Sequence, residues 1–247
     1  MSNVNSTSPN KGSSSESSFL SELAGEATSK LQALKENVRD KEAKAELINI
    51  ALGKIYQFFS LFSRHANDLE PEIQRPYNLD NQTTFAPLKW NDAVSDYRKR
   101  DFSDNAFMDH VSFKVRLTSP APVTVIRRFN QAETLKKELH AFGLRPVDDL
   151  DKMLRSNQQE ILQVSLAPDF LVRIRFQGNY DDDRIDMLCN NLEGFGAVAF
   201  KLAPEQITPH LLDEVGRYLI GRTDSLPAIL NQTKHFQKQS SQPPRGL

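Results

Sequence analysis

The sequence predicts an α+β protein. We expect an N-terminal long helix or helical hairpin, coiled-coil-like, followed by an antiparallel sheet of about six strands packed against two helices, in the order ββα-ββββ-α. Two observations support this fold class. Apolar residues recur at alternating spacings of three and four over residues 24–69, which keeps them on one face of an α-helix. From residue 110 onward, apolar and polar residues alternate with a period of two, as in strands with one buried face.

The apolar positions of residues 24–69 form a seam in which Lys41 is the single member that is not apolar. The unbroken spacing favours one helix, whereas the charged stretch at residues 37–44 would also suit the turn of a hairpin. Such a seam is typical of a coiled coil or a docking helix. We expect self-association, or docking on a protein partner, through an interaction seam of Leu31, Leu34, Val38, Ile48, Leu52, Ile55, Phe59 and Phe62.

Composition and helix-breaking residues divide the chain into five parts. Serine-rich, weakly apolar segments cannot bury enough surface to offset the entropy of ordering, and Pro71 and Pro76 end the long helix. The parts are a disordered tail at 1–18, the amphipathic helix at 19–70, a linker at 71–109, the α+β domain at 110–222 and a mostly disordered tail at 223–247.

The period of two predicts six strands, at 110–117, 123–129, 161–167, 170–176, 184–190 and 197–202. The first two are expected to pair as a hairpin with a four-residue loop, and the last four as a meander with a two-residue turn at Pro168–Asp169. A helix should follow at 130–142 and end at Gly143, and another at 209–220 with Thr208 as its cap. One sheet face would carry the core residues Phe113, Val115, Leu117, Leu162, Val164, Leu166, Val172, Ile174, Phe176, Ile185, Met187, Val198, Phe200 and Leu202.

The opposite face of the predicted sheet is polar and carries basic residues. Long basic side chains on one strand face suit phosphates or an acidic partner, so we assign a candidate polyanion-binding set of Lys114, Arg116, Arg173 and Arg175. No aromatic residue interleaves with them, and solvated strands commonly carry Arg and Lys. Asp186 and Glu160 lie close enough in sequence to pair with these cations.

Motifs for catalysis, metal binding and cofactors are missing from the sequence. The five histidines have no zinc-ligand spacing, and Asp181–Asp183 lack the spacing of a calcium loop, so they are expected to form a solvated hairpin connection. His110 beside Asp109 would suit a general base, but no nucleophile is near it in sequence. Cys189 is expected to be buried and inert. We therefore predict no metal and no cofactor.

Charge, cysteine content and hydropathy bound the setting of the protein. The formal net charge is −1, so no bulk field attracts it to nucleic acid or lipid. One cysteine suits a reducing, cytoplasmic compartment, and no apolar run is long enough to span a membrane. We expect a non-enzymatic interaction, scaffold or adaptor protein. The alternatives are a nucleic-acid-associated accessory protein that uses the basic face, and an enzyme whose site is assembled from residues distant in sequence.

Overall fold

A computed structural model of the chain describes residues 18–102, 105–156 and 160–235. These residues divide into two compact units, Met1–Ala43 and Lys44–Leu247, of which the second contains the sheet. The predicted α+β fold class is confirmed: a long N-terminal helix precedes an antiparallel sheet and further helices. The predicted tails at residues 1–17 and 236–247 lie outside the described residues.

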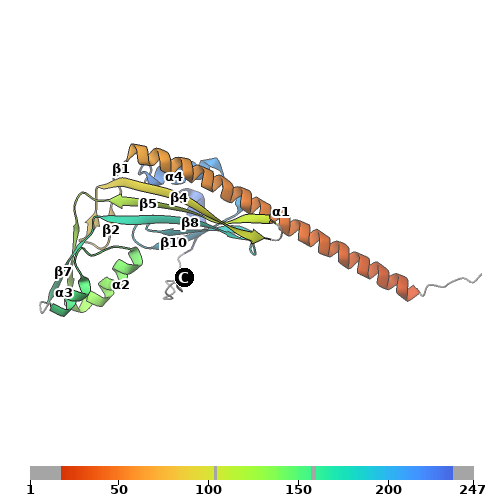
Figure 1. The fold of residues 1–247 in the computed structure, drawn as a ribbon, viewed down its shortest axis with the longest axis horizontal. Helices are drawn as coiled ribbons and strands as arrows, with labels where there is room; N and C mark the ends of the chain where they lie inside the picture. The colour runs from red at the N-terminus through yellow and green to blue at the C-terminus, as the bar shows by residue number, and fades with distance from the viewer. Residues whose placement is uncertain (1–17, 103–104, 157–159, 236–247) are drawn as a thin grey trace, which may run out of the picture. The chain divides into compact units, whose positions relative to one another are not determined.

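Helix α1 runs from Ser18 to Leu69 as one helix of 52 residues, not as a hairpin (Figure 1). The helix stops after Leu69 because Glu70 adopts a left-handed backbone conformation, with a φ of 42°. Pro71 follows and cannot continue a helix. In the first unit every described residue of α1 from Phe19 on is exposed. In the second unit one face of α1 is buried from Ala45 onward.

The main sheet contains seven strands among the described residues, all antiparallel, in the order β1-β4-β5-β8-β9-β10-β11. Its five long members are β4 (Leu88–Phe102), β5 (Asn105–Thr118), β8 (Asp169–Asn179), β9 (Arg184–Asn190) and β10 (Ala197–Leu202). The two-residue strands β1 (Glu72–Ile73) and β11 (Lys234–His235) lie at its edges.

The predicted linker at 71–109 is wrong, because most of it belongs to strands. It contains β1, the small pair β2 (Tyr77–Asn78) and β3 (Thr84–Phe85), the long strand β4 and the start of β5. Few apolar residues mark β4 in the sequence: after Trp90 its inward positions are Ala93, the small polar Ser95 and Tyr97, whose ring lies 4.6 Å from that of Tyr56 of α1. A register shift between Trp90 and Asp92 also breaks the alternation of apolar and polar residues.

Two of the predicted strand pairings are also wrong, although all six predicted strands exist and β8 pairs with β9 and β9 with β10, as the predicted meander requires. β6 (Val123–Arg128) pairs with β7 (Ile161–Leu166) in a separate two-stranded sheet, while β5 pairs with β8. The two pairs form one ribbon that is interrupted where the Ser119 N–H donates to the Pro168 carbonyl at 2.9 Å. Alternation predicts which side chains face the core, but it does not identify the neighbouring strand. Leu162, Val164 and Leu166 are buried as predicted, but in this second sheet.

Three helical segments accompany the β6–β7 pair. The turn η1 (Phe129–Gln131) leads into α2 (Ala132–Phe142), which ends at Gly143 with a φ of 68°. Helix α3 (Leu150–Ser156) follows. Leu135 and Leu139 of α2 are buried, so this region extends the core beyond the main sheet.

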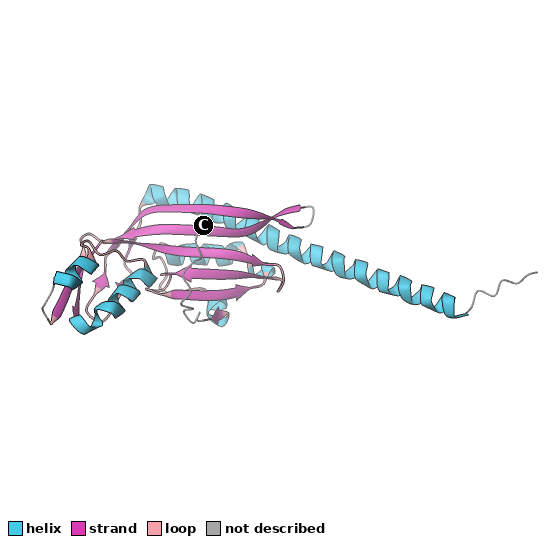
Figure 2. Cartoon of the chain, turned by 60° about the horizontal axis from the view of Figure 1, so that its bottom comes forward, coloured by secondary structure: helices cyan, strands magenta, loops and turns pink. Residues whose placement is uncertain are grey.

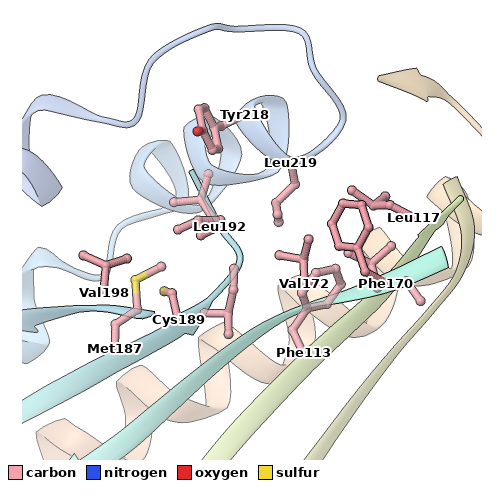
Figure 3. Packing of buried hydrophobic residues seen from close by; sticks show 14 of the residues in the cluster. Phe113, Leu117, Phe170, Val172, Met187, Cys189, Leu192, Val198, Tyr218 and Leu219 are labelled. Carbon is pink, nitrogen blue, oxygen red and sulfur yellow. The ribbon is translucent and has the colours of Figure 1, made fainter. Parts of the chain in front are cut away.

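The core lies between one face of the main sheet and two helices, α4 (Pro209–Leu219) and residues 44–69 of α1 (Figure 1). The turn η2 (Pro204–Gln206) leads to α4, and Thr208 caps that helix as predicted, with its Oγ1 accepting from the Leu211 N–H at 3.2 Å. Figure 3 shows Tyr218 and Leu219 of α4 above Val172 and Phe170 of β8. Helix α1 contributes Phe59, whose ring lies 4.8 Å from that of Phe113, centroid to centroid.

The predicted C-terminal tail at 223–247 is wrong for its described part. Helix α5 (Ala228–Gln232) places Leu230 in the core, and Leu226 before it is also buried. The chain then pairs with β10 through β11, and Lys234 forms an ion pair with Glu193. Leu226, Ile229 and Leu230 pack this short segment against the core. The polar residues around them explain why the sequence pattern did not predict it.

Candidate functional site

The first candidate surface is the part of the predicted interaction seam that lies in the first unit. Leu31, Leu34 and Val38 are 59%, 53% and 55% exposed. Phe19, Leu20 and Leu23 on the same helix are also exposed. We call the stripe Leu31, Leu34 and Val38 the exposed seam. Apolar side chains at these spacings favour contact with another apolar surface.

The structure restricts the interaction seam to this N-terminal half. Ile48, Leu52, Ile55 and Phe59 are fully buried within the second unit, and Phe62 is half-buried. Their partners are strands of the same unit, so a wide apolar stripe here serves the core. The heptad spacing continues through both halves because the same face of α1 carries the exposed apolar residues of the first unit and the buried ones of the second. For Leu31, Leu34 and Val38, the interaction seam stays a prediction.

The second candidate surface is the face of the main sheet opposite the core. Figure 2 shows this face toward the viewer, with α1 and α4 behind the strands and α2 at one end. The four candidate polyanion-binding residues Lys114, Arg116, Arg173 and Arg175 lie on it, since they alternate with buried residues of β5 and β8. We call this surface the open face.

The strand register brings two of these cations directly together. Lys114 of β5 lies opposite Arg173 of β8, and Arg175 follows two residues further along β8. Side chains of directly opposite residues begin about 4.5–5.5 Å apart, so they interact across the strands. Like charges in that position disfavour the pairing. The sequence predicted the shared face, but only the pairing of β5 with β8 makes Lys114 and Arg173 neighbours.

Arg116 is the candidate whose charge is most fully neutralised. It forms an ion pair with Asp169, which also binds Arg145 at 2.8 Å. Burial tends to raise the pKa of Asp169, but hydrogen bonds from Arg116 and Arg145 lower that pKa below its ordinary value. This cluster joins the ends of β5 and β8, so Arg116 has a structural role there.

A β-bulge shapes the open face beside Arg175. Arg98 of β4 pairs with His110 and Lys99 pairs with Met108, which leaves Asp109 as the extra residue of β5. Nδ1 of His110 lies 2.7 Å from Oδ2 of Asp109 and 3.0 Å from Nη2 of Arg175. When Nδ1 carries a proton it donates to the carboxylate, and Nη2 of Arg175, which can only donate, then contacts this nitrogen without a hydrogen bond and pairs with the same carboxylate oxygen at 4.0 Å.

Gln177 completes this cluster. Its Nε2 donates to the backbone carbonyl of Asp109 at 2.9 Å and to Oδ1 of the same residue at 3.0 Å. Burial tends to raise the pKa of Asp109, but the hydrogen bonds from His110 and Gln177, together with the nearby charge of Arg100, lower it. Asp109 is therefore a carboxylate at neutral pH and stabilises the cations around it.

The open face is hollowed over these residues by a depression of about 690 Å³. Apart from Tyr97, Phe113, Ile174 and Leu188, its lining is polar or charged. We call it the sheet-face depression and define it by its ionisable residues Asp96, Arg98, His110, Lys114, Arg173 and Arg175. Sequence reasoning missed Arg98, because β4 was not predicted, and it did not connect His110 with the basic set.

Other residues considered from the sequence have structural surroundings. Asp182 pairs with Arg184 and Asp183 with Lys44, in the connection between the paired strands β8 and β9 as predicted. Cys189 is buried on β9, and burial raises the pKa of its thiol. Within residues 18–102, 105–156 and 160–235, no group of His, Cys, Asp and Glu is arranged to hold a metal ion. In the same ranges, no helix is long and apolar enough to cross a membrane.

Comparisons with known proteins returned no significant match. No protein-family model matches the chain, and neither the curated proteins nor the solved structures include one that is significantly similar to it.

Proposed function

We propose that the protein is a non-enzymatic interaction protein that self-associates through the exposed seam of α1, with its α+β unit as a structured body. The observation that carries this proposal is the apolar stripe Leu31, Leu34 and Val38 on a helix with no buried residue between Phe19 and Lys44. An isolated helix has little stability in water, and proteins stabilise such helices by packing their apolar face. Burial of each large side chain contributes about 1.5–3 kcal/mol.

Charges beside the exposed seam favour an antiparallel pair of helices. In a parallel pair in register, Lys41 would face its own copy in the seam, and Lys30 would flank Lys35 of the second copy. An antiparallel pair centred between Leu34 and Val38 avoids the contact between two Lys41 side chains in the seam, although Lys35 then flanks Lys35 of the second copy at the rim. It places Leu34 opposite Val38 of the second copy, and Lys41 opposite Leu31, where the aliphatic stem of the lysine can pack and its charge can reach water.

The lone buried cysteine supports a reducing compartment for this association, and we place the protein in the cytoplasm on that ground. Self-association would then depend on side-chain packing of α1 and not on a disulfide. Concentration would set the balance between monomer and dimer.

Sedimentation of the full chain tests the proposal. The wild type should sediment as a dimer, and Leu31→Asp with Leu34→Asp should convert it to a monomer. The matched control is Ser29→Asp with Ala33→Asp, which adds the same charge to the opposite side of α1 and should leave the dimer intact. A wild-type monomer at the highest concentration tested would refute self-association.

The orientation has its own test in a Cys189→Ser background. Leu34→Cys with Val38→Cys should cross-link two copies in an antiparallel pair, whereas Leu34→Cys alone should do so in a parallel pair. Efficient cross-linking of the single variant would contradict the antiparallel arrangement while leaving self-association intact.

A further inference from the structure

We infer that the sheet-face depression is a binding site for a small ligand that carries a phosphate group. Its lining contains four basic residues, Arg98, Lys114, Arg173 and Arg175, against one acidic residue, Asp96, and even with the neighbouring Asp109, which lies 4.0 Å from Arg175, these six residues carry a net charge of +2. The chain as a whole has a formal net charge of −1. Positive charge is therefore concentrated here, and a volume of about 690 Å³ is typical of small-ligand sites.

Sheet register places three of the cations at neighbouring positions on one face. Lys114 and Arg173 are directly opposite, and Arg175 is two residues from Arg173 on the same face, about 6.6 Å along the strand. Side chains of this length, starting from positions so close together, can all reach one tetrahedral phosphate group. Guanidinium groups bind phosphate oxygens through paired hydrogen bonds, and a lysine adds a further charge.

Lys114 and Arg173 carry like charges at directly opposite strand positions. Lys114 has a long contact of 3.5 Å to Asp96, and both side chains are about half exposed. Within the described part of the chain, Arg173 forms no ion pair and no side-chain hydrogen bond and remains exposed. Like charges on opposite strands cost stability, and a bound phosphate would convert that repulsion into attraction for both side chains.

Arg175 is the cation whose position the fold controls most closely. The bulge at Asp109 places the carboxylate 2.7 Å from Nδ1 of His110 and 4.0 Å from the guanidinium of Arg175, so the carboxylate holds both side chains. His110 is 7% exposed, so its ring is fixed by its surroundings. Gln177 fixes Asp109 in turn. Such support holds a binding side chain in place before the ligand arrives, which lowers the entropic cost of binding.

The charge distribution favours a small ligand over a nucleic acid. Register places Asp186 on the open face outside the depression, and Asp169 neutralises Arg116 at its end. A nucleic acid follows a continuous basic track that contacts several successive phosphates. Here the basic residues form one cluster that acidic residues bound on two sides.

Titration calorimetry of the full chain with inorganic phosphate, at fixed sodium chloride, tests the inference. We expect saturable binding that Arg173→Gln weakens by at least about tenfold, the usual effect of losing a charge-assisted hydrogen bond. Lys114→Gln should act in the same direction. The matched control is Lys201→Gln on β10, an exposed lysine outside the depression, which should leave the affinity within about twofold.

Titration with a second probe, phenyl phosphate, tests whether the depression also binds an organic group attached to the phosphate. Binding that depends on Arg173 supports the site for either probe and identifies a phosphate ester or free phosphate as the ligand. Absence of binding by both probes would overturn the inference. Equal weakening by Lys201→Gln would also overturn it, because the effect would then be one of general charge. Tight binding of an oligonucleotide, with a salt dependence of several phosphates, would replace it with the nucleic-acid alternative.

Discussion

The side-chain amide of Asn67 binds Trp90 and the backbone next to it at the bulge of β4. Oδ1 of Asn67 accepts from the indole Nε1–H of Trp90 at 2.9 Å and from the Ala93 N–H at 2.8 Å. Nδ2 of Asn67 donates to the Ala93 carbonyl at 2.9 Å. One residue near the end of α1 thus satisfies three groups of the strand beside it, two of them donors on fully or almost fully buried residues.

Replacement of Asn67 by alanine should lower the free energy of unfolding by about 2–4 kcal/mol, because two donors would be left without an acceptor. Urea denaturation measures the change. The control is Gln57→Ala on an exposed position of the same helix, which should change stability by less than about 0.5 kcal/mol. An equal effect of the two substitutions would contradict the role of Asn67.

Two glycines should respond in opposite ways to alanine. A Cβ on Gly178 of β8 would lie 2.8 Å from the Tyr180 ring and 3.2 Å from both Ile48 and Leu52 of α1. Gly178→Ala should therefore destabilise the protein by about 1–3 kcal/mol. Gly53 of α1 has open space around the same position, so Gly53→Ala should stabilise it by about 0.5–1 kcal/mol. Thermal denaturation of both variants checks the contrast.

The Asp169 cluster should make stability depend on pH in acid. The pKa of Asp169 is lowered in the folded protein, so its contribution is present above the pKa of the unfolded carboxyl and is lost as pH falls through the lowered value. Asp169→Asn should be less stable than the wild type at pH 7, and the difference should shrink below about pH 4. Denaturation at pH 7 and pH 3 measures it.

Arg145→Gln removes one of the two guanidinium partners of Asp169. The loss of stability that it causes should likewise be larger at pH 7 than at pH 3. A difference between Asp169→Asn and wild type that stays constant from pH 7 to pH 3 would show that the carboxylate charge contributes nothing to stability.

Removal of residues 1–43 should leave the second unit folded. No described residue in that segment is buried, so the melting temperature of residues 44–247 should stay within about 2–4 °C of the full chain. Removal of residues 1–56 would delete Ile48, Leu52 and Ile55 from the core and should prevent stable folding. Loss of folding in the shorter deletion would show that the exposed seam packs on the protein itself.

The period of apolar residues predicts much of this fold. It gives the six strands from residue 110 onward, and Gly143 and Thr208 mark helix ends where the structure has them. It does not give the pairing of β5 with β8, because Val115 and Val172 fit a core with any neighbouring strand. The pattern does not predict strand β4, because the bulge near Trp90 breaks the alternation of apolar and polar residues.

The candidate site was predictable to a similar extent. Alternation on β5 and β8 places Lys114 and Arg173 on one face, but their direct opposition depends on a pairing across residues 119–168. The seam spacing cannot separate Leu31 from Leu52, since both continue the same heptad. Only the position of the sheet decides that one is exposed and the other buried.

The interrupted ribbon formed by the β5–β8 and β6–β7 pairs has a consequence for the order in which the chain folds. Pairing of Thr118 with Asp169 must close a loop of residues 119–168, which is entropically costly in a disordered chain. Pairing of β6 with β7 closes a shorter loop first and brings those two ends together. We therefore expect the β6–β7 pair to form early and the central sheet to close from it, strand by strand, with a folding rate sensitive to substitutions in that pair.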